Sequence, residues 1–364
     1  MRHGLTALTV AGSFALALAA CSPSTPAPEA SVPPSSSPLA SLPQPERPAT
    51  GVDPWPDFGD FAVDSNKAVL PAHNLSVEER WEDYDYLSRI ANTAQARWVG
   101  SWEDNTRVAG LARDVYRKAA ATESIGLVAY QGMRDYPCER AAADPSLELA
   151  YQERTEAVVR DLPSTGATAW IILEPALVQT LDTCDADPRG AWLGDAAATL
   201  ASAGAAVYLD VTGLAVLSPE EAVVQVARLD LAHVVGFSLN VGQHRPTAEQ
   251  RAWGESFLAA LAASGADVTS SRGTADPGQP GLGLIIDTSR NGVPLERGQC
   301  NAPEAGIGTA PRLVADGVLD AVVWIKRPGE SDGSCNGGPG VGQFSQPIAL
   351  ELARRGVLDP AYAN

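Results

Sequence analysis

From Phe58 onward, the chain alternates short apolar runs with longer, Ala-rich segments of helical character. Most of the apolar runs are continuous, which is typical of parallel strands that helices cover on both faces. Seven such strands are predicted: Ala96–Trp102, Ile125–Tyr130, Trp170–Leu173, Ala205–Asp210, Val234–Asn240, Leu282–Asp287 and Ala321–Lys326. Strands that alternate with helices predict one α/β domain over residues 58–360, built as a barrel or as a doubly wound sheet.

Two of the helical segments begin with residues that cap a helix. Ser218–Glu221 and Thr247–Gln250 each have a hydroxyl residue followed three positions later by Glu or Gln, as in a capping box. Pro219 strengthens the first signal, because proline is favoured at the first position of a helix. We therefore expect Ser218 and Thr247 to be N-caps.

Polar residues follow nearly every predicted strand. In α/β barrels the carboxyl ends of the strands share one face, where the site is built. The first strand contains Trp98, and the later strand ends are followed by or contain Arg134, Asp135, Glu174, Asp210, Asn240, Asp287, Arg290, Lys326, Glu330 and Asp332. This distribution predicts a cleft at the carboxyl ends of the strands.

Carboxylates are the most informative members of this set. Glycosidases commonly use two, an acid that protonates the leaving oxygen and a base or nucleophile on the other face. The candidates are Asp135, Asp210, Asp287, Glu330 and Asp332. Asp287 lies three residues before Arg290, so we expect these two residues to form an ion pair.

A serine hydrolase is an alternative that the sequence disfavours. Gly329–Gly333 matches the pattern G-x-S-x-G, which requires a strand, a sharp turn and then a helix. The following residues, Ser334–Pro339, cannot begin a helix promptly, and no suitable histidine follows them. The paired-carboxylate interpretation is therefore preferred.

The N-terminus has the pattern of an export signal. Arg2 and His3 precede an apolar run that ends at Ala20, which is too short for a membrane span and typical of a signal peptide over residues 1–20. The sequence LAAC, ending at Cys21, resembles a bacterial lipobox and predicts a lipid anchor on that cysteine, whereas an ordinary secretory signal would make the cysteine incidental. Residues 21–57 are rich in Pro, Ser and Ala, which predicts a tether.

Composition narrows the possible partners. The net charge of -18 argues against binding to nucleic acid or to anionic membrane surfaces, so membrane contact is expected only through the lipid on Cys21. Four other cysteines remain, an even number that suggests disulfides in an exported chain, with three possible pairings. The four histidines are scattered and no C-x-x-C motif exists, so we expect no metal site.

The segment Asp320–Phe344 carries Lys326, Glu330 and Asp332 just after a strand, and it resembles the last active-site motif of glycoside hydrolase family 6, the cellobiohydrolases and endoglucanases that cleave β-1,4-glucan. Other stretches that resemble motifs of this family, in the same order, are Ala96–Trp102, Tyr208–Asp210, Gly236–Val241, Leu284–Gly292, Cys300–Pro303 and Gly308–Thr309. The resemblance covers residues 61–356. It implies a distorted (β/α) barrel of about seven parallel strands with the cleft at the strand carboxyl ends, and inverting hydrolysis of β-1,4-glucan without a cofactor.

The resemblance also implies roles for individual residues. Asp332 matches the carboxylate proposed as the base, and Asp135 matches the aspartate that raises the pKa of the acid. Trp98 matches a sugar-stacking platform and Tyr130 a tyrosine of the cleaved sugar's pocket. Further expected glycan-binding residues are Asn240, Lys326 and Glu330. The family's cysteine pairing implies the disulfides Cys138–Cys184 and Cys300–Cys335.

The chain departs from the family's pattern at the acid. The family carries its acid in a Glu-Pro-Asp motif, and this chain has Ala176 at the Asp position. A histidine and a tryptophan of the family are replaced by Gly213 and Val216, and Gln299 stands where another tryptophan is usual. The Gly- and Ser-rich loop after the family's first cysteine is replaced by Glu139–Glu148.

Three functions are compatible with these departures. The protein is a weakened β-1,4-glucanase, a surface lipoprotein that binds β-glucan or another cell-wall glycan without cleaving it, or an envelope scaffold with a vestigial cleft. Alanine has no proton to give, and loss of a general acid lowers a rate by roughly 10²–10⁴-fold. Asp135 is one residue that could replace the acid; the other possible rescue is a glycan with a better leaving group.

Overall fold

The computed structural model describes residues 48–266, 281–295 and 299–358. The predicted signal peptide, Cys21 and most of the predicted tether lie outside the described residues. Within the described ranges, no helix is both long and apolar enough to cross a membrane.

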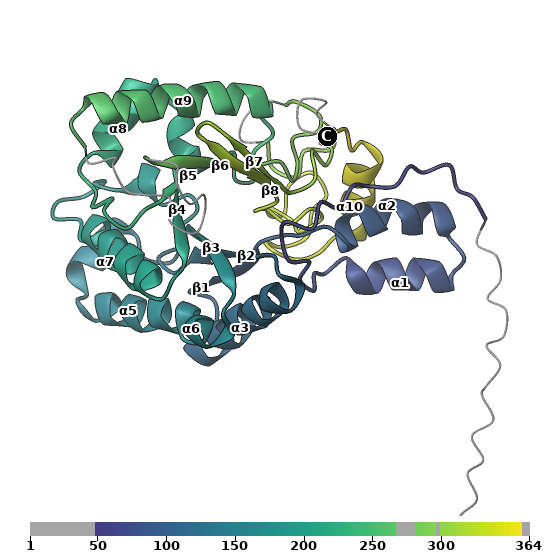
Figure 1. Ribbon diagram of the computed structural model, residues 1–364, viewed down its shortest axis with the longest axis horizontal. Coiled ribbons are helices and arrows are strands. Elements are labelled where there is room, and N and C mark those ends of the chain that lie inside the picture. The colour runs from purple at the N-terminus through teal and green to yellow at the C-terminus, as the bar shows by residue number, and fades with distance from the viewer. Residues whose placement is uncertain (1–47, 267–280, 296–298, 359–364) are drawn as a thin grey trace, which may run out of the picture. The chain divides into compact units, whose positions relative to one another are not determined.

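One eight-stranded sheet organises the domain, in the order β1-β2-β3-β4-β5-β6-β8-β7 (Figure 1). The strands are β1 (Arg97–Gly100), β2 (Ile125–Gln131), β3 (Thr168–Leu173), β4 (Ala206–Asp210), β5 (Gly236–Leu239), β6 (Gly283–Asp287), β7 (Arg312–Asp316) and β8 (Leu319–Val323). Every neighbouring pair is parallel except β7 with β8. The seven parallel strands and the distorted α/β barrel expected from the resemblance are confirmed, and the doubly wound alternative is wrong.

The sheet curls so that its first strand meets the end of β8. The N–H of Ala96 donates to the carbonyl of Trp324 at 2.8 Å, and the indole N–H of Trp98 donates to the carbonyl of Ile325 at 2.7 Å. The side chain of Arg327 donates back to the carbonyl of Ala96 at 2.8 Å. These bonds form a seam between β1 and β8 that relies on side chains as well as backbone groups.

The strand β7 is an antiparallel addition that was not predicted. It forms a hairpin with β8 through Gly317, whose φ of +64° lies in the left-handed region that favours glycine. It lies at the edge of the sheet, and its apolar run is only three residues long, Leu313–Ala315, between Arg312 and Asp316. The dipeptide Asp316-Gly317 is a strong hairpin signal that could have revealed it.

Helices cover the outer face of the sheet, with α3, α5 and α7 beside the first four strands and α8 and α9 beside β5 and β6 (Figure 1). The α-helices are α1 (Val69–Val77), α2 (Trp81–Ala91), α3 (Asn105–Thr122), α4 (Cys138–Ala143), α5 (Ser146–Val159), α6 (Leu162–Thr165), α7 (Arg189–Ser202), α8 (Pro219–Val226), α9 (Thr247–Ala263) and α10 (Gln346–Arg354). Two 3₁₀ helices, η1 (Val178–Thr180) and η2 (Thr212–Val216), follow β3 and β4.

The two predicted helix caps have different outcomes. Ser218 forms the expected capping box with Glu221 at the start of α8. Thr247 is the first residue of α9 instead of its N-cap, and no side chain caps this helix. The hydroxyl of Thr247 is buried and accepts a hydrogen bond from the side-chain amide of Asn291 at 3.0 Å, so it is engaged away from the helix end.

Alternation along the strands separates two cores. One set of side chains fills the inside of the barrel, including Trp170 and Tyr208, whose ring centroids are 5.1 Å apart. The other set, including Val128 and Tyr130 of β2, packs outward against the helices. The barrel is therefore a filled core, and space for a ligand is left at the end of the strands.

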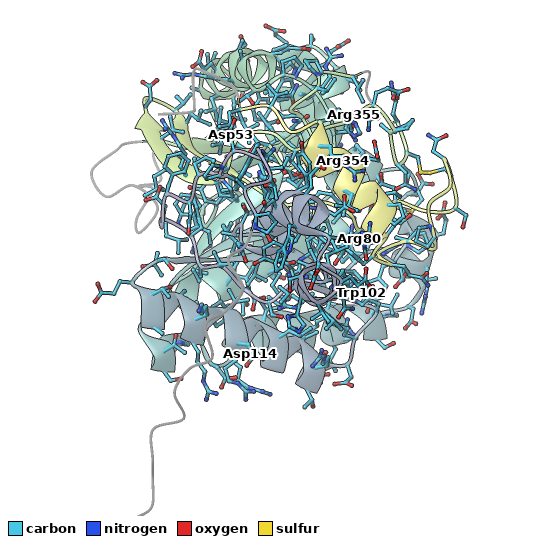
Figure 2. The ribbon with its side chains drawn as sticks, turned by 90° about the vertical axis from the view of Figure 1, so that its right-hand side faces the viewer. Asp53, Arg80, Trp102, Asp114, Arg354 and Arg355 are labelled. Carbon is cyan, nitrogen blue, oxygen red and sulfur yellow. A yellow bond between two sulfur atoms is a disulfide. The ribbon has the colours of Figure 1, made fainter. Side chains whose placement is uncertain are left out.

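The start of the described chain packs against the domain. Asp53 accepts a hydrogen bond at its backbone carbonyl from Arg89 of α2 at 3.0 Å, and the same guanidinium lies 5.0 Å from the ring centroid of Trp55. α2 also packs against α10, where Arg354, labelled in Figure 2, pairs with Asp83. Hydrogen-bond and cation–π contacts thus join Asp53 and Trp55 to α2, within the last residues of the predicted tether, and the tether boundary stays a prediction.

Candidate active site

A cleft of about 330 Å³ lies at the carboxyl ends of the strands. It brings together many of the residues that the sequence analysis singled out: Trp98, Ala176, Asp210, Gly213, Arg290, Gln299, Cys300, Lys326 and Asp332. A second cavity of about 360 Å³ shares Gln131, Pro175 and Ala176 with it, so the two cavities adjoin at Ala176. The two adjoining cavities together form one groove at the strand ends, hereafter called the groove.

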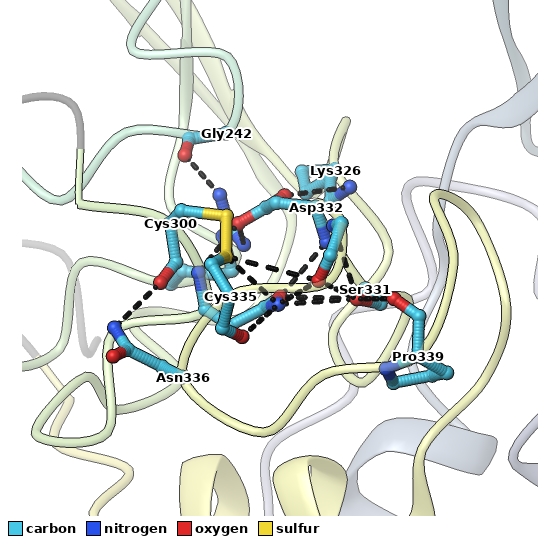
Figure 3. The surroundings of a disulfide bond; sticks show 11 residues. Gly242, Cys300, Lys326, Ser331, Asp332, Cys335, Asn336 and Pro339 are labelled. Atoms are coloured by element: carbon cyan, nitrogen blue, oxygen red, sulfur yellow. Dashed lines mark hydrogen bonds and ion pairs between the residues drawn. A yellow bond between two sulfur atoms is a disulfide. The ribbon is translucent and has the colours of Figure 1, made fainter.

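Asp332 is held by two cations and a backbone amide (Figure 3). Its carboxylate lies 2.7 Å from Nη1 of Arg290 and 2.9 Å from Nζ of Lys326, and it accepts the N–H of Asn301 at 3.0 Å. Burial acts to raise the pKa of Asp332, but Arg290 and Lys326 outweigh it and hold the pKa well below its usual range. Asp332 is therefore ionised at any physiological pH and can orient and polarise a water molecule.

The expected ion pair between Asp287 and Arg290 is wrong. Arg290 pairs with Asp332, while the fully buried carboxylate of Asp287 accepts backbone N–H groups at 2.9–3.2 Å. These donors are Gly242, Ser289, Ile325 and Lys326. Asp287 therefore fixes the loops that follow β5, β6 and β8, and so sets the position of Lys326.

Ala176 exposes its side chain on the cleft wall with a φ of +67°. Its N–H donates to Oδ1 of Asp210 at 3.0 Å. The other oxygen of Asp210 accepts from the hydroxyls of Thr212 at 2.8 Å and Ser238 at 2.9 Å. Burial raises the pKa of Asp210 to about 6 against the effect of these donors. A carboxyl group that can hold a proton in weakly acidic solution therefore lies beside Ala176, where the family resemblance places the acid.

Glu174 is fully buried and organises the neighbouring loop. Its Oε1 accepts the N–H groups of Gly132 at 2.7 Å and Met133 at 3.1 Å. Burial raises the pKa of Glu174 to about 8, so the carboxyl group is mainly protonated at neutral pH. Because its contacts are to the loop after β2, it positions that loop; it borders the second cavity but not the cleft that contains Asp332.

Two expected glycan-binding residues lie outside the cleft. Tyr130 is fully buried on the outer face of β2, where its ring stacks on Tyr151 and its hydroxyl lies 3.0 Å from Oγ1 of Thr155. Asn240 is also fully buried, and its side chain caps the backbone of Arg245 and Asp287. Both side chains are used inside the protein in this structure, and their contact with a glycan stays a prediction.

Gln131 replaces Tyr130 on the cleft wall. Side chains alternate along a strand, so the residue after Tyr130 points to the opposite face. Gln131 lines the cleft and donates from its side-chain amide to the carbonyl of Pro175 at 2.7 Å. The sequence rule that selects strand ends would have found Gln131 if β2 had been extended by one residue.

Asp135 and Glu330 lie beside the groove but do not line either cavity. Asp135 is exposed and accepts a hydrogen bond from the hydroxyl of Ser101 at 2.7 Å. Glu330 lies 3.1 Å from Nζ of Lys67 and 3.8 Å from Nη1 of Arg327, so it ties the N-terminal segment to the loop of Asp332. The role of Asp135 toward an acid stays a prediction.

Both disulfides expected from the resemblance are confirmed. Cys138 bonds to Cys184, and Cys300 bonds to Cys335. The second bond flanks the loop of Asp332, where Asn301 accepts the N–H of Asp332 at 2.8 Å through its side chain (Figure 3). The loop that presents the charged carboxylate is thus fixed covalently as well as by hydrogen bonds.

Among the residues that the structure describes, no cluster of three or more His, Cys, Asp or Glu side chains could hold a metal ion.

The fold and the groove define a class of protein, an α/β barrel with carboxylates at the carboxyl ends of its strands, as glycoside hydrolases commonly have. The profile described as "Glycosyl hydrolases family 6" matches residues 61–355, and the chain belongs to this family. The resemblance recognised in the sequence is confirmed.

Individual relatives agree with this membership. Endoglucanase A of Cellulomonas fimi is 33% identical over 274 residues, which are 75% of this chain and 56% of the relative. Endoglucanase 1 of Streptomyces halstedii is 31% identical over 273 residues, which are 72% of this chain and 79% of the relative. The endoglucanase Cel6 of Mycobacterium tuberculosis, solved with methyl-cellobiosyl-4-deoxy-4-thio-β-D-cellobioside, matches with a TM-score of 0.65 and 28% identity over 81% of this chain and 96% of that one.

Proposed function

We propose that this protein binds β-1,4-glucan in the cleft and hydrolyses it with inversion, more slowly than a family member with an intact acid would. The observation that carries the proposal is the ion-paired Asp332, which shares one cleft with Trp98 and Ala176. An aromatic ring and a fixed carboxylate are the elements needed to hold a sugar and to direct a water to its anomeric carbon. The endoglucanase relatives support glucan as the substrate.

Three residues of the cleft have defined parts in this reaction. Trp98 offers its ring to a sugar, and its indole N–H is already bound to the carbonyl of Ile325, which fixes the ring. Asp332, ionised by Arg290 and Lys326, orients the attacking water. Ala176 supplies no proton, so departure of the sugar alkoxide is the difficult step, and the rate is lower by roughly 10²–10⁴-fold.

The second candidate function is glycan binding without cleavage. Ala176 is the observation that favours it, because a cleft that lacks a proton donor can still hold a sugar through its ring and hydrogen-bonding groups. The two functions predict the same affinity and differ only in turnover. A protein that neither binds nor cleaves cello-oligosaccharides or cell-wall glycan would be a scaffold.

The deciding experiment is a long incubation of the full chain with cellohexaose, with products separated by chromatography. The variant Ala176→Asp is treated in parallel, and binding is measured by calorimetry. Products from the natural chain support hydrolysis. Products from the variant alone show that the cleft lacks only its acid, and binding without products from either chain leaves the glycan-binding function.

We propose in addition that the protein is exported and anchored by a lipid on Cys21. The apolar run before Cys21 and the two disulfides support an oxidising compartment outside the cytoplasm. The test is fractionation of a bacterial host that expresses the full chain or its Cys21→Ala variant. The anchor predicts that the natural chain sediments with membranes and the variant does not; equal release of both would show a secretory signal without an anchor.

A further inference from the structure

Asp210 is the carboxyl group that lies beside the missing acid. It ends β4 and is fully buried, and it is bonded at Oδ1 to the N–H of Ala176, the residue at the acid position. Asp210 borders the cleft that Ala176 and Asp332 line, but its side chain has no exposed surface, so a proton from its carboxyl group would reach a bound sugar through a group that covers it.

Thr212 provides that connection. Its Oγ1 lies 2.8 Å from Oδ2 of Asp210 and accepts the N–H of Val241 at 2.9 Å, which fixes the hydroxyl group in place. Thr212 lines the same cleft as Ala176 and Asp332. Ser238 also bonds to Oδ2 of Asp210, at 2.9 Å, but it is not among the residues that line the cleft. Of these two hydroxyls, Thr212 is the one that links the buried carboxyl to the cleft.

We propose that Asp210 is the proton source for the departing sugar and that Thr212 passes the proton to it; this inference rests on the proposed hydrolysis. Asp210 gives its carboxyl proton to Oγ1 of Thr212, and Thr212 gives its own hydroxyl proton to the glycosidic oxygen. The bond between that oxygen and the anomeric carbon breaks, and its electron pair stays with the oxygen. A water oriented by Asp332 bonds to the anomeric carbon and releases one proton to solvent, and solvent later reprotonates Asp210.

The protonation behaviour of Asp210 is consistent with this role. Burial raises its pKa to about 6, so it carries a proton in weakly acidic solution and loses it above that pH. A general acid works best when its pKa lies near the working pH. The groups that face Asp210 directly are Ala176, Thr212 and Ser238, and the charged groups that share its cleft are Arg290, Lys326 and Asp332.

The test compares two substrates that differ in their need for a proton. Cleavage of cellohexaose releases a sugar alkoxide, which needs a proton in order to depart. Cleavage of 2,4-dinitrophenyl β-cellotrioside releases dinitrophenolate, which departs without a proton. The full chain and its variants Asp210→Asn, Thr212→Val, Thr212→Ser and Ser238→Ala are assayed on both, and thermal unfolding checks that each variant folds.

We expect Asp210→Asn and Thr212→Val to slow cellohexaose hydrolysis by about 100-fold or more and to leave hydrolysis of the dinitrophenyl glycoside nearly unchanged. Thr212→Ser should restore most of the loss, and Ser238→Ala should cause a smaller decrease than Thr212→Val. With cellohexaose, kcat of the natural chain should fall above a pH of about 6, and this decrease should be absent with the dinitrophenyl glycoside.

Other outcomes overturn the inference. Equal losses on both substrates would show that Asp210 and Thr212 only support the fold of the cleft, and no loss on cellohexaose would exclude them as the proton path. If Asp210→Asn does not fold, Thr212→Val and Thr212→Ser decide alone. A natural chain that cleaves only the dinitrophenyl glycoside refutes this proton source and keeps the proposed hydrolysis, whereas a chain that cleaves neither substrate refutes the hydrolysis itself.

Discussion

Asn301 and Asp332 exchange two hydrogen bonds: the N–H of Asn301 donates to the Asp332 carboxylate at 3.0 Å, and the N–H of Asp332 donates to the Asn301 side chain at 2.8 Å. The disulfide Cys300–Cys335 closes the same pair of loops. The position of the charged carboxylate therefore depends on a small, covalently closed unit (Figure 3).

Removal of this disulfide should affect both stability and function. The two cysteines are 35 residues apart, and a loop of that size predicts a loss on the order of 3–4 kcal/mol in the free energy of unfolding for Cys300→Ser with Cys335→Ser. Affinity for cellohexaose should fall as well, because the loop of Asp332 loosens. Urea unfolding and calorimetry measure the two effects. The matched control, Cys138→Ser with Cys184→Ser, should lose similar stability and keep more of the affinity; equal affinity losses would contradict a local role.

Removal of Asp332 should destabilise the protein as well as abolish turnover. In Asp332→Ala, Arg290 and Lys326 are left as two unpaired cations with exposed side-chain fractions of 6% and 18%. The expected loss is roughly 3 kcal/mol in the free energy of unfolding at pH 7, measured in urea. A variant as stable as the natural chain would show that these cations have other partners.

The pH dependence of Asp332 has a definite sign. The pKa of Asp332 is lower in the folded protein than in the unfolded chain. Its contribution to the free energy of unfolding is therefore present above the unfolded pKa of about 4 and is lost as the pH falls below that value. The stability difference between the natural chain and Asp332→Ala should therefore shrink on acidification from pH 5 to pH 2.

Glu174 should change the pH dependence of the free energy of unfolding in the opposite direction. Its folded pKa of about 8 exceeds the unfolded value of about 4, so the folded state keeps a proton that the unfolded chain releases between these values. Stability should fall as the pH rises from 5 to 8. In Glu174→Gln, which can still accept from Gly132 and Met133, that decrease should be reduced. Urea unfolding at four pH values measures the difference, and parallel curves for both chains would contradict a buried, protonated Glu174.

Trp98 should dominate glycan affinity among the aromatic residues near the groove. Loss of a stacking ring weakens binding by on the order of 1–3 kcal/mol, so Trp98→Ala should bind cellohexaose about 10-fold or more weakly. Trp98→Phe keeps a ring and loses the hydrogen bond to Ile325, so it separates stacking from positioning. Trp102, which is 44% exposed and does not line the cleft, is the matched control. Equal losses in Trp98→Ala and Trp102→Ala would relocate the binding surface.

The fold was predictable from the sequence because buried parallel strands are continuous apolar runs. The edge strand β7 was missed because its apolar run, Leu313–Ala315, is short and is flanked by two charged residues. The position of Asp332 was predictable because it follows a strand closely. The cleft position of Gln131 was missed because a one-residue difference in the strand end exchanges the inner and outer faces, and alternation places Gln131, the residue after Tyr130, in the cleft.

Which side chains interact with one another was harder to predict than which residues lie at the strand ends. Arg290 is close to Asp287 in sequence, but four backbone donors already surround Asp287, and Arg290 instead reaches Asp332 on another loop. Thr212 gave no signal of its own, because its importance comes from the oxygen of Asp210 beside it. Such relationships depend on loop geometry, which hydrophobic periodicity does not encode.

The seam between β1 and β8 has a consequence for how this groove can vary. Trp98 belongs both to the seam and to the cleft, because its indole N–H joins the two edges while its ring faces the ligand space. A sugar stacked on Trp98 would therefore contact the seam between β1 and β8. Few hydrogen bonds join the two strands there, so little resists a widening of the barrel at this point. Exchanges at Trp98 and Arg327 could make the groove broader or narrower while every other strand ladder keeps its register.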